Sequence, residues 1–95
     1  MNCYQFLELF SPLAAYVESS EPNTLTYEVF TATADPARVL IMERYVSAAD
    51  LTETHRRSEA FLSFGKALKE QMALELPPTA LRVYDELAVG HWGSE

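Results

Sequence analysis

The sequence is poor in cysteine and in basic residues, and these two shortages exclude several classes of protein. Its single cysteine, Cys3, cannot form an internal disulfide and offers no metal-ligand spacing. Only 7 residues are Lys or Arg against 14 that are Asp or Glu, and the net charge is -7. Without clustered basic side chains, neither nucleic acid nor an anionic membrane surface is an expected partner.

Long apolar runs and cofactor motifs are also missing. No stretch approaches the roughly 18 apolar residues of a membrane-spanning helix, and the start lacks the pattern of a signal peptide. We therefore expect a soluble cytoplasmic protein. The sequence shows no glycine-rich phosphate loop, no metal triad and no Ser-His-Asp order, so we expect activity without a cofactor or metal.

Hydrophobic residues, by contrast, are abundant and make up 48% of the 95 residues. A chain of this length is expected to form one domain, residues 1–95, whose core is too small to hide so many apolar side chains. Homodimer interfaces are more apolar than ordinary protein surface. We therefore expect a homodimer with a largely apolar interface formed by sheet faces.

The first half of the chain predicts a helix and a hairpin. Apolar residues three and four positions apart predict a helix over residues 4–17, with a kink or restart at Pro12 and Ser11 as its cap. Residues 25–32 and 39–46 are predicted strands, because they alternate apolar side chains or are rich in strand-forming residues. The short connection between them indicates an antiparallel hairpin.

The second half predicts one more helix and one more strand. The helix is expected over residues 47–73, with Ser47 as N-cap and Asp50 completing a variant of the capping box. Pro77-Pro78 ends it, and a last strand follows over residues 80–89. The order helix, strand, strand, helix, strand predicts an α+β fold, a ferredoxin-like βαββαβ unit without its first strand.

Three stretches of the sequence are similar to segments of a known family. They are EPNTLTYEVF (21–30), VLIMERYVSAADLTETHRRSEAF (39–61) and PPTALRVYDELA (77–88). Taken together over residues 6–88, the chain resembles the antibiotic biosynthesis monooxygenase family of dimeric α/β-barrel proteins.

The sequence departs from this family at three points. The family begins with a central strand ahead of the first helix, whereas here the helix begins almost at Met1. Asn23 stands where Gly is usual, and Glu59 where many members have a second His. A missing central strand leaves strand edges open. Another element or the partner subunit then fills the slot, or residues 3–10 form a strand instead of a helix.

The resemblance implies a ferredoxin-like dimeric α/β barrel and a cofactor-free oxygenase. Its substrate would be a small aromatic molecule, such as a polyketide or quinol, held in a cavity between sheet and helices. Other members degrade haem, isomerise small metabolites or have no known reaction. The alternative hypothesis is a non-catalytic dimerisation or ligand-binding domain. A cavity that reaches His55 favours the enzyme, and a filled interior favours the alternative.

His55 is the leading catalytic candidate. It lies at the border of the apolar stripe of the second helix, and an imidazole at a cavity edge can take and give protons near neutral pH. Ser58 lies one turn further along. Tyr45 takes the place of a Trp or Tyr that often borders the family's pocket, where it would bind a substrate carbonyl. The alternatives are a surface His without a role and an ordinary core or interface Tyr.

Two acidic residues of the hairpin are the next candidates. A turn at Asp35 and Pro36 places Glu28 opposite Glu43, and both would share a face with Phe30. That face would line the cavity or the dimer seam and contact substrate. Two carboxylates so close resist being ionised together, which would provide a general base. The other interpretation is a pair of solvated acids at a dimer edge.

Overall fold

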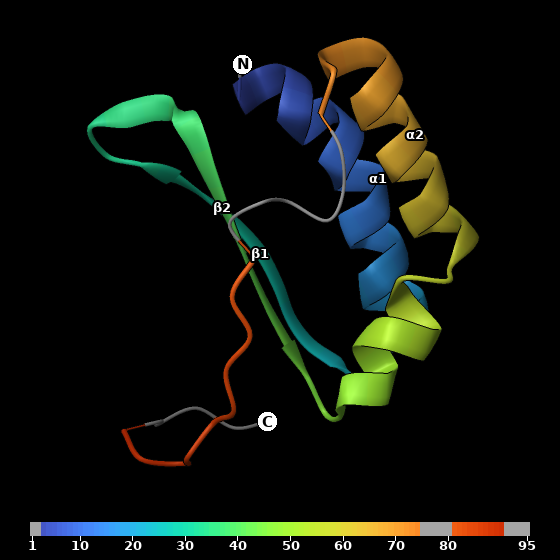
Figure 1. Cartoon of the computed structure of the whole chain (residues 1–95), viewed down its shortest axis with the longest axis vertical. Coiled ribbons are helices and arrows are strands. Elements are labelled where there is room, and N and C mark those ends of the chain that lie inside the picture. Colours follow the sequence, from blue (N-terminus) through green and yellow to red (C-terminus); the bar gives the residue numbers. More distant parts are fainter. Residues whose placement is uncertain (1–2, 75–80, 91–95) are drawn as a thin grey trace.

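The computed structural model describes residues 3–74 and 81–90, and its helices and strands form two layers (Figure 1). In chain order the elements are helix α1 (Cys3–Ser20), strand β1 (Thr24–Ala32), strand β2 (Asp35–Tyr45), the π-helix η1 (Asp50–His55) and helix α2 (Glu59–Met72). Helices α1 and α2 lie against one face of the hairpin (Figure 1). Six buried apolar side chains form the core: Phe6, Phe10, Leu13, Val17, Phe64 and Leu68. The fold is α+β, consistent with a ferredoxin-like fold that lacks some elements.

Helix α1 is unbroken through Pro12, so the predicted restart is wrong. Ser11 does not cap a new helix, because its hydroxyl donates back to the carbonyl of Leu7 at 2.7 Å. The buried side chains recur three and four residues apart on both sides of Pro12, and this continuous apolar stripe holds the helix together. Residues 3–10 are therefore helical rather than a strand. Among the helices that the structure describes, none has the length and apolar character needed to cross a membrane.

The hairpin register differs from the predicted one by a single residue. The chain turns at residues 33–34, earlier than expected, and Tyr27 then lies opposite Glu43 while Glu28 lies opposite Met42. A shift of one residue sends a side chain to the other face of a sheet. The predicted pairing of Glu28 with Glu43 is therefore wrong.

The register decides which hairpin side chains meet the helices. Four of them pack against the core: Tyr27, Val29, Val39 and Ile41. The opposite side, called here the outer face, carries Thr26, Glu28, Phe30, Leu40, Met42 and Arg44. Three of its large apolar side chains are well exposed, namely Phe30, Leu40 and Met42.

The predicted second helix is divided in two. Helix η1 ends at His55, and α2 begins after Ser58, whose hydroxyl accepts a hydrogen bond from the amide of Phe61 at 3.1 Å. Ser58 thus acts as a second N-cap within the expected helix. The predicted contact between Ser47 and Asp50 is present, since the amide and hydroxyl of Ser47 both donate to Asp50 Oδ2, each at 2.9 Å. The residue that precedes η1 is Ala49, however, and no side chain caps that helix, so Ser47 is not its N-cap.

Residues 81–90 form neither a helix nor a strand, so the predicted last strand is wrong over the part that the structure describes. Ala80, Pro77 and Pro78 lie outside the described residues. The sheet of the described residues holds β1 and β2 alone, and the segment pairs with neither of them. The segment contacts the hairpin through Glu86, which forms an ion pair with Arg44 at 2.6 Å.

Candidate functional site

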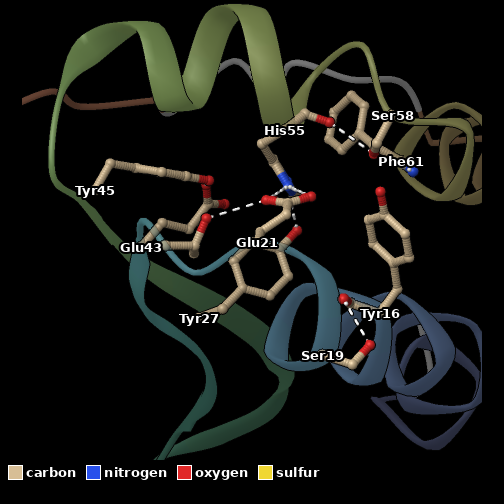
Figure 2. A network of polar contacts seen from close by, with 10 residues as sticks. Tyr16, Ser19, Glu21, Tyr27, Glu43, Tyr45, His55, Ser58 and Phe61 are labelled. Carbon is tan, nitrogen blue, oxygen red and sulfur yellow. Dashed lines mark hydrogen bonds and ion pairs between the residues drawn. The ribbon is translucent and has the colours of Figure 1, made fainter.

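Three polar side chains meet between the helices and the hairpin (Figure 2). His55 Nδ1 lies 3.0 and 3.2 Å from the two carboxylate oxygens of Glu21, and His55 Nε2 lies 3.1 Å from the hydroxyl oxygen of Tyr27. His55 is 1% exposed and Glu21 is 3% exposed. We call these three residues the triad.

Three elements supply the triad. Glu21 follows the last residue of α1, and Tyr27 lies on the side of β1 that faces the helices. His55 is the last residue of η1, where the amide of Arg56 donates to the carbonyl of Leu51 at 2.9 Å, five residues back. π-helical turns are rare in proteins overall, and those that do occur are often found at functional sites. Here the π-helix brings His55 into the layer between helices and sheet.

Aromatic rings surround His55. The ring centroids of Tyr27, Phe61 and Tyr45 lie 4.9, 5.0 and 6.0 Å from that of the imidazole. Phe10 stacks on the ring of Tyr27, with 5.1 Å between the two ring centroids. Water is thereby excluded, and hydrogen bonds in such surroundings are stronger than in water. The space next to His55 is filled by side chains of the protein itself.

The hydrogen bonds of the triad are complete. Glu21 accepts a further bond from the hydroxyl of Thr24 at 3.0 Å. Within residues 3–74 and 81–90, every buried side-chain nitrogen and oxygen has a hydrogen-bond partner. Burying such polar groups without partners would cost several kcal/mol, on the order of 1–3 for each atom. The triad is therefore a fully satisfied polar network inside an apolar layer.

The geometry assigns a direction to proton transfer. With the Glu21 carboxylate accepting from Nδ1–H of His55, Nε2 is the acceptor into which Tyr27 donates. Burial raises the pKa of Tyr27, and the charges of Glu43 and Glu21 raise it further. Tyr27 therefore stays protonated and acts as a donor. Its hydroxyl can pass a proton to His55 while it takes another from outside.

Glu43 and Tyr45 form the solvent side of the triad. Glu43 is exposed and lies opposite Tyr27 in the hairpin, and the hydroxyl of Tyr45 donates to Glu43 Oε1 at 2.6 Å. Burial raises the pKa of Tyr45, as do its hydrogen bond to Glu43 and the charge of that carboxylate.

The structure brings three of the predicted site residues together: His55, Tyr45 and Glu43. The expected border position of His55 is wrong, because η1 places the ring in the buried layer. Ser58 lies three residues after His55, and its hydroxyl donates to the carbonyl of His55 at 2.8 Å and accepts from the amide of Phe61 at the start of α2. Ser58 shapes the break between the helices.

Glu28 and Phe30 lie on the outer face, on the other side of the sheet from His55, and do not join the triad. Glu28 instead lines a shallow hollow of about 360 Å³ together with Thr26, Met42, Arg44 and Glu86. A second hollow of about 210 Å³ is lined by Gln5, Glu8, Leu9, Gln71 and Met72. His55 lines neither. In the described part of the chain, no three His, Cys, Asp or Glu side chains are grouped so that they could hold a metal ion.

Sequence reasoning missed Glu21 and Tyr27. Both stand in the stretch EPNTLTYEVF, where Glu21 had the character of a loop residue and Tyr27 that of an ordinary strand residue. The contacts to His55 span 34 and 28 residues, and no local spacing predicts such contacts. One feature of the sequence could have pointed to Glu21, namely an acidic residue placed between a helix and a strand whose apolar sides belong to the same layer.

A comparison with protein families finds a match that includes the whole site. The model of the family described as antibiotic biosynthesis monooxygenase matches residues 4–67. This range covers well over half of the 95 residues and contains the triad as well as Glu43 and Tyr45. No curated protein and no solved structure matches the chain. The extent of the family match shows that this chain belongs to the antibiotic biosynthesis monooxygenase family.

Proposed function

We propose that the domain is a cofactor-independent monooxygenase, or a related tailoring enzyme, acting on an electron-rich aromatic such as a polyketide or quinol. The observation that carries this proposal is the triad, a buried imidazole held by a carboxylate and connected to a tyrosine hydroxyl. A phenolic substrate that has lost its proton can pass an electron to oxygen itself. The protein then needs only to bind it, accept the proton and exclude water.

The proton would leave the substrate through Tyr27. As Tyr27 donates its own proton to His55 Nε2, its oxygen becomes the acceptor for the proton of the substrate hydroxyl. The raised pKa of Tyr27 supports this concerted transfer, because a free phenolate at this position is disfavoured. The Glu21 carboxylate, 3.0 Å from Nδ1, stabilises the imidazolium that forms.

Glu43 and Tyr45 would orient the substrate. The Glu43 carboxylate already accepts one phenol, that of Tyr45, at 2.6 Å. A substrate hydroxyl that takes this position lies next to Tyr27, since Glu43 and Tyr27 are cross-strand partners. The ring of Tyr45, displaced from Glu43, offers an aromatic surface for stacking.

A homodimer is part of the proposal. Domains of this family commonly dimerise, and the outer face of the hairpin exposes Phe30, Leu40 and Met42. Exposed apolar groups that gather on one face favour association, because their burial removes them from water. Pairing of the outer faces would leave the triad on the opposite side of each sheet.

One observation favours a second candidate, a non-catalytic dimerisation or ligand-binding domain. The interior next to His55 is filled by three aromatic rings, and His55 itself is 1% exposed. A triad without room for substrate would serve to fix the positions of α1, η1 and β1. The two candidates differ in whether a ligand can displace Tyr45 and reach Tyr27.

Oxygen consumption with a panel of quinols and phenolic aromatics tests the proposal. Tyr27→Phe keeps the ring but removes the hydroxyl, and we expect turnover to fall by about 10²–10⁴-fold, the usual contribution of a positioned acid–base group. Tyr84→Phe is the matched control, because its ring is 81% exposed and lies outside the triad. Full turnover by Tyr27→Phe would rule out this proton path. No turnover by the unaltered protein, combined with saturable binding of the same aromatics, would support the second candidate.

A further inference from the structure

One short turn holds both ends of η1. The turn between α1 and β1 contains Glu21, which binds His55 at the end of η1, and Asn23, which binds Asp50 at its start. The amide of Asn23 donates to Asp50 Oδ1 at 3.2 Å. Two contacts that are two residues apart in the turn thus fix a six-residue helix at its first and last residues.

The Asn23–Asp50 contact is well supported on both sides. Asp50 Oδ2 accepts from the amide and the hydroxyl of Ser47, each at 2.9 Å. The hydrogen bonds from Asn23 and Ser47 lower the pKa of Asp50, which keeps it ionised and able to accept all three. On the other side, the carbonyl of Asn23 accepts from the amide of Val46 at 3.0 Å, which ties the turn to the end of β2.

The side chain of Asn23, and not its backbone conformation, distinguishes it from a glycine at this position. Among the described residues outside glycine, positive φ occurs at Ala73 and Ala88, so Asn23 does not stand in the left-handed region where Gly would be favoured. A residue with a short amide, by contrast, can reach Asp50. The replacement of the family's usual Gly therefore adds a hydrogen bond and relieves no backbone strain.

We propose that Asn23 and Asp50 form a clasp that positions His55, so that its Nδ1 faces Glu21 and its Nε2 faces Tyr27. Both residues are positioning residues, since neither contacts the imidazole. The start of η1 is half-buried and its end is buried, and Asp50 at the start does not belong to the apolar core, so the clasp anchors the end of the helix that the core does not hold. The role of the clasp in turnover rests on the proposed function, whereas its effect on His55 does not.

The orientation of the imidazole has a chemical consequence. Only the tautomer with the proton on Nδ1 leaves Nε2 free to accept from Tyr27. Loss of the clasp would let η1 shift relative to Glu21, and the hydrogen bond that selects this tautomer would weaken. The neutral imidazole would then divide between its two tautomers.

Nitrogen NMR of the histidine ring tests the clasp directly. The sequence has two histidines, so His91→Gln assigns the signals of His55. At the alkaline limit of a pH titration, we expect the unaltered protein to show a proton on Nδ1. Asn23→Asp places a carboxylate against Asp50, and we expect the ratio of Nδ1–H to Nε2–H to fall by about tenfold, the equivalent of one lost hydrogen bond.

A double variant provides the rescue. In Asn23→Asp combined with Asp50→Asn, the amide and the carboxylate exchange places, so the contact is restored and the tautomer ratio should return. Glu53→Gln is the matched control, because Glu53 lies on the same helix and pairs with Arg57 at 3.1 Å; it should leave the ratio unchanged. Failure of the double variant to restore the ratio would overturn the clasp.

Two further results keep the test decisive. If Asn23→Asp does not fold, Asn23→Ala removes the donor alone, and a ratio equal to that of the unaltered protein would overturn the proposal. If the unaltered protein oxidises no quinol, the proposed function fails, yet the ratios still decide whether the clasp positions His55. Where turnover is present, it should fall in Asn23→Asp and recover in the double variant together with the tautomer ratio.

Discussion

Removal of the His55 side chain should be the most destabilising change at the site. His55→Ala removes the imidazole that is the hydrogen-bond partner of both Glu21 and Tyr27. Glu21, which is 3% exposed, then keeps a single hydrogen bond, the one from Thr24. Leaving a buried group without its hydrogen-bond partner costs about 1–3 kcal/mol, and more when that group is a carboxylate. That is a large part of the total stability of about 5–15 kcal/mol typical of a folded domain. The border position expected from the sequence would have predicted a loss within about 0.5 kcal/mol.

The size of this effect can be traced to Glu21 by a second substitution. Glu21→Gln in the His55→Ala background removes the carboxylate that has lost its partner, so it should recover part of the lost stability, about 1–2 kcal/mol. In the unaltered background the same substitution should destabilise. A substitution that destabilises one background and stabilises the other indicates direct coupling between the two side chains.

Urea unfolding followed by circular dichroism measures all four proteins of this cycle. The slope with denaturant should stay constant, which shows that the variants unfold from the same compact state. If His55→Ala does not fold, recovery of folding in the double variant is itself the expected rescue. A cost below about 1 kcal/mol for His55→Ala, with additive effects of the two substitutions, would refute the buried contact between Glu21 and His55.

Three other outcomes follow from the structure. The pKa of Tyr27 is raised in the folded state, so its contribution to stability should be complete below the ordinary tyrosine pKa near 10. Above that pH the free energy of unfolding should fall, by at most about 1.4 kcal/mol per pH unit for this group. The free energy of unfolding of Tyr27→Phe should fall less steeply over the same pH range, and an equally steep fall would contradict the assignment. Sedimentation at micromolar concentration should show a dimer and not the 10.7 kDa monomer. Met42→Glu on the outer face should dissociate the dimer, while Leu62→Glu, at an exposed position of α2, should leave it intact. Any turnover should persist with a chelator and gain nothing from added flavin or haem, and activity that is lost with the chelator and restored by metal would refute this expectation.

The sequence predicted those features that depend on local pattern. The helix that begins at Cys3, the hairpin and the contact between Ser47 and Asp50 were recognisable, because periodicity and short-range hydrogen bonds determine them. The family was also recognisable, since two of the three similar stretches, 21–30 and 39–61, lie in the matched residues 4–67. The fold class follows from these elements and their order.

Features that depend on distant contacts were not predictable in the same way. A hairpin register that differs by one residue from the expected one moved Glu43 to the side of the sheet that carries Tyr27, away from Glu28, and the cap at Ser58 divided a helix whose apolar stripe looked continuous. His55 was identified as important, but its partner Glu21 lies 34 residues away. A last strand was expected from its apolar residues, yet the described part of that segment pairs with neither strand of the hairpin.

The π-helix lets the chain between residues 50 and 55 hold one residue more than an α-helix of the same span. A wide turn of this kind holds one more residue than an α-helical turn, so deletion of a single residue would return the segment to α-helical geometry. The elements on either side would keep their orientation, because the wide turn already absorbs the extra residue. A further insertion, by contrast, would turn everything after it by about 100°, the rotation of one residue in a helix with 3.6 residues per turn. Either His55 would then leave Glu21 or α2 would lose its apolar contact with α1. In divergent relatives we therefore expect this segment to accept single deletions and to avoid insertions.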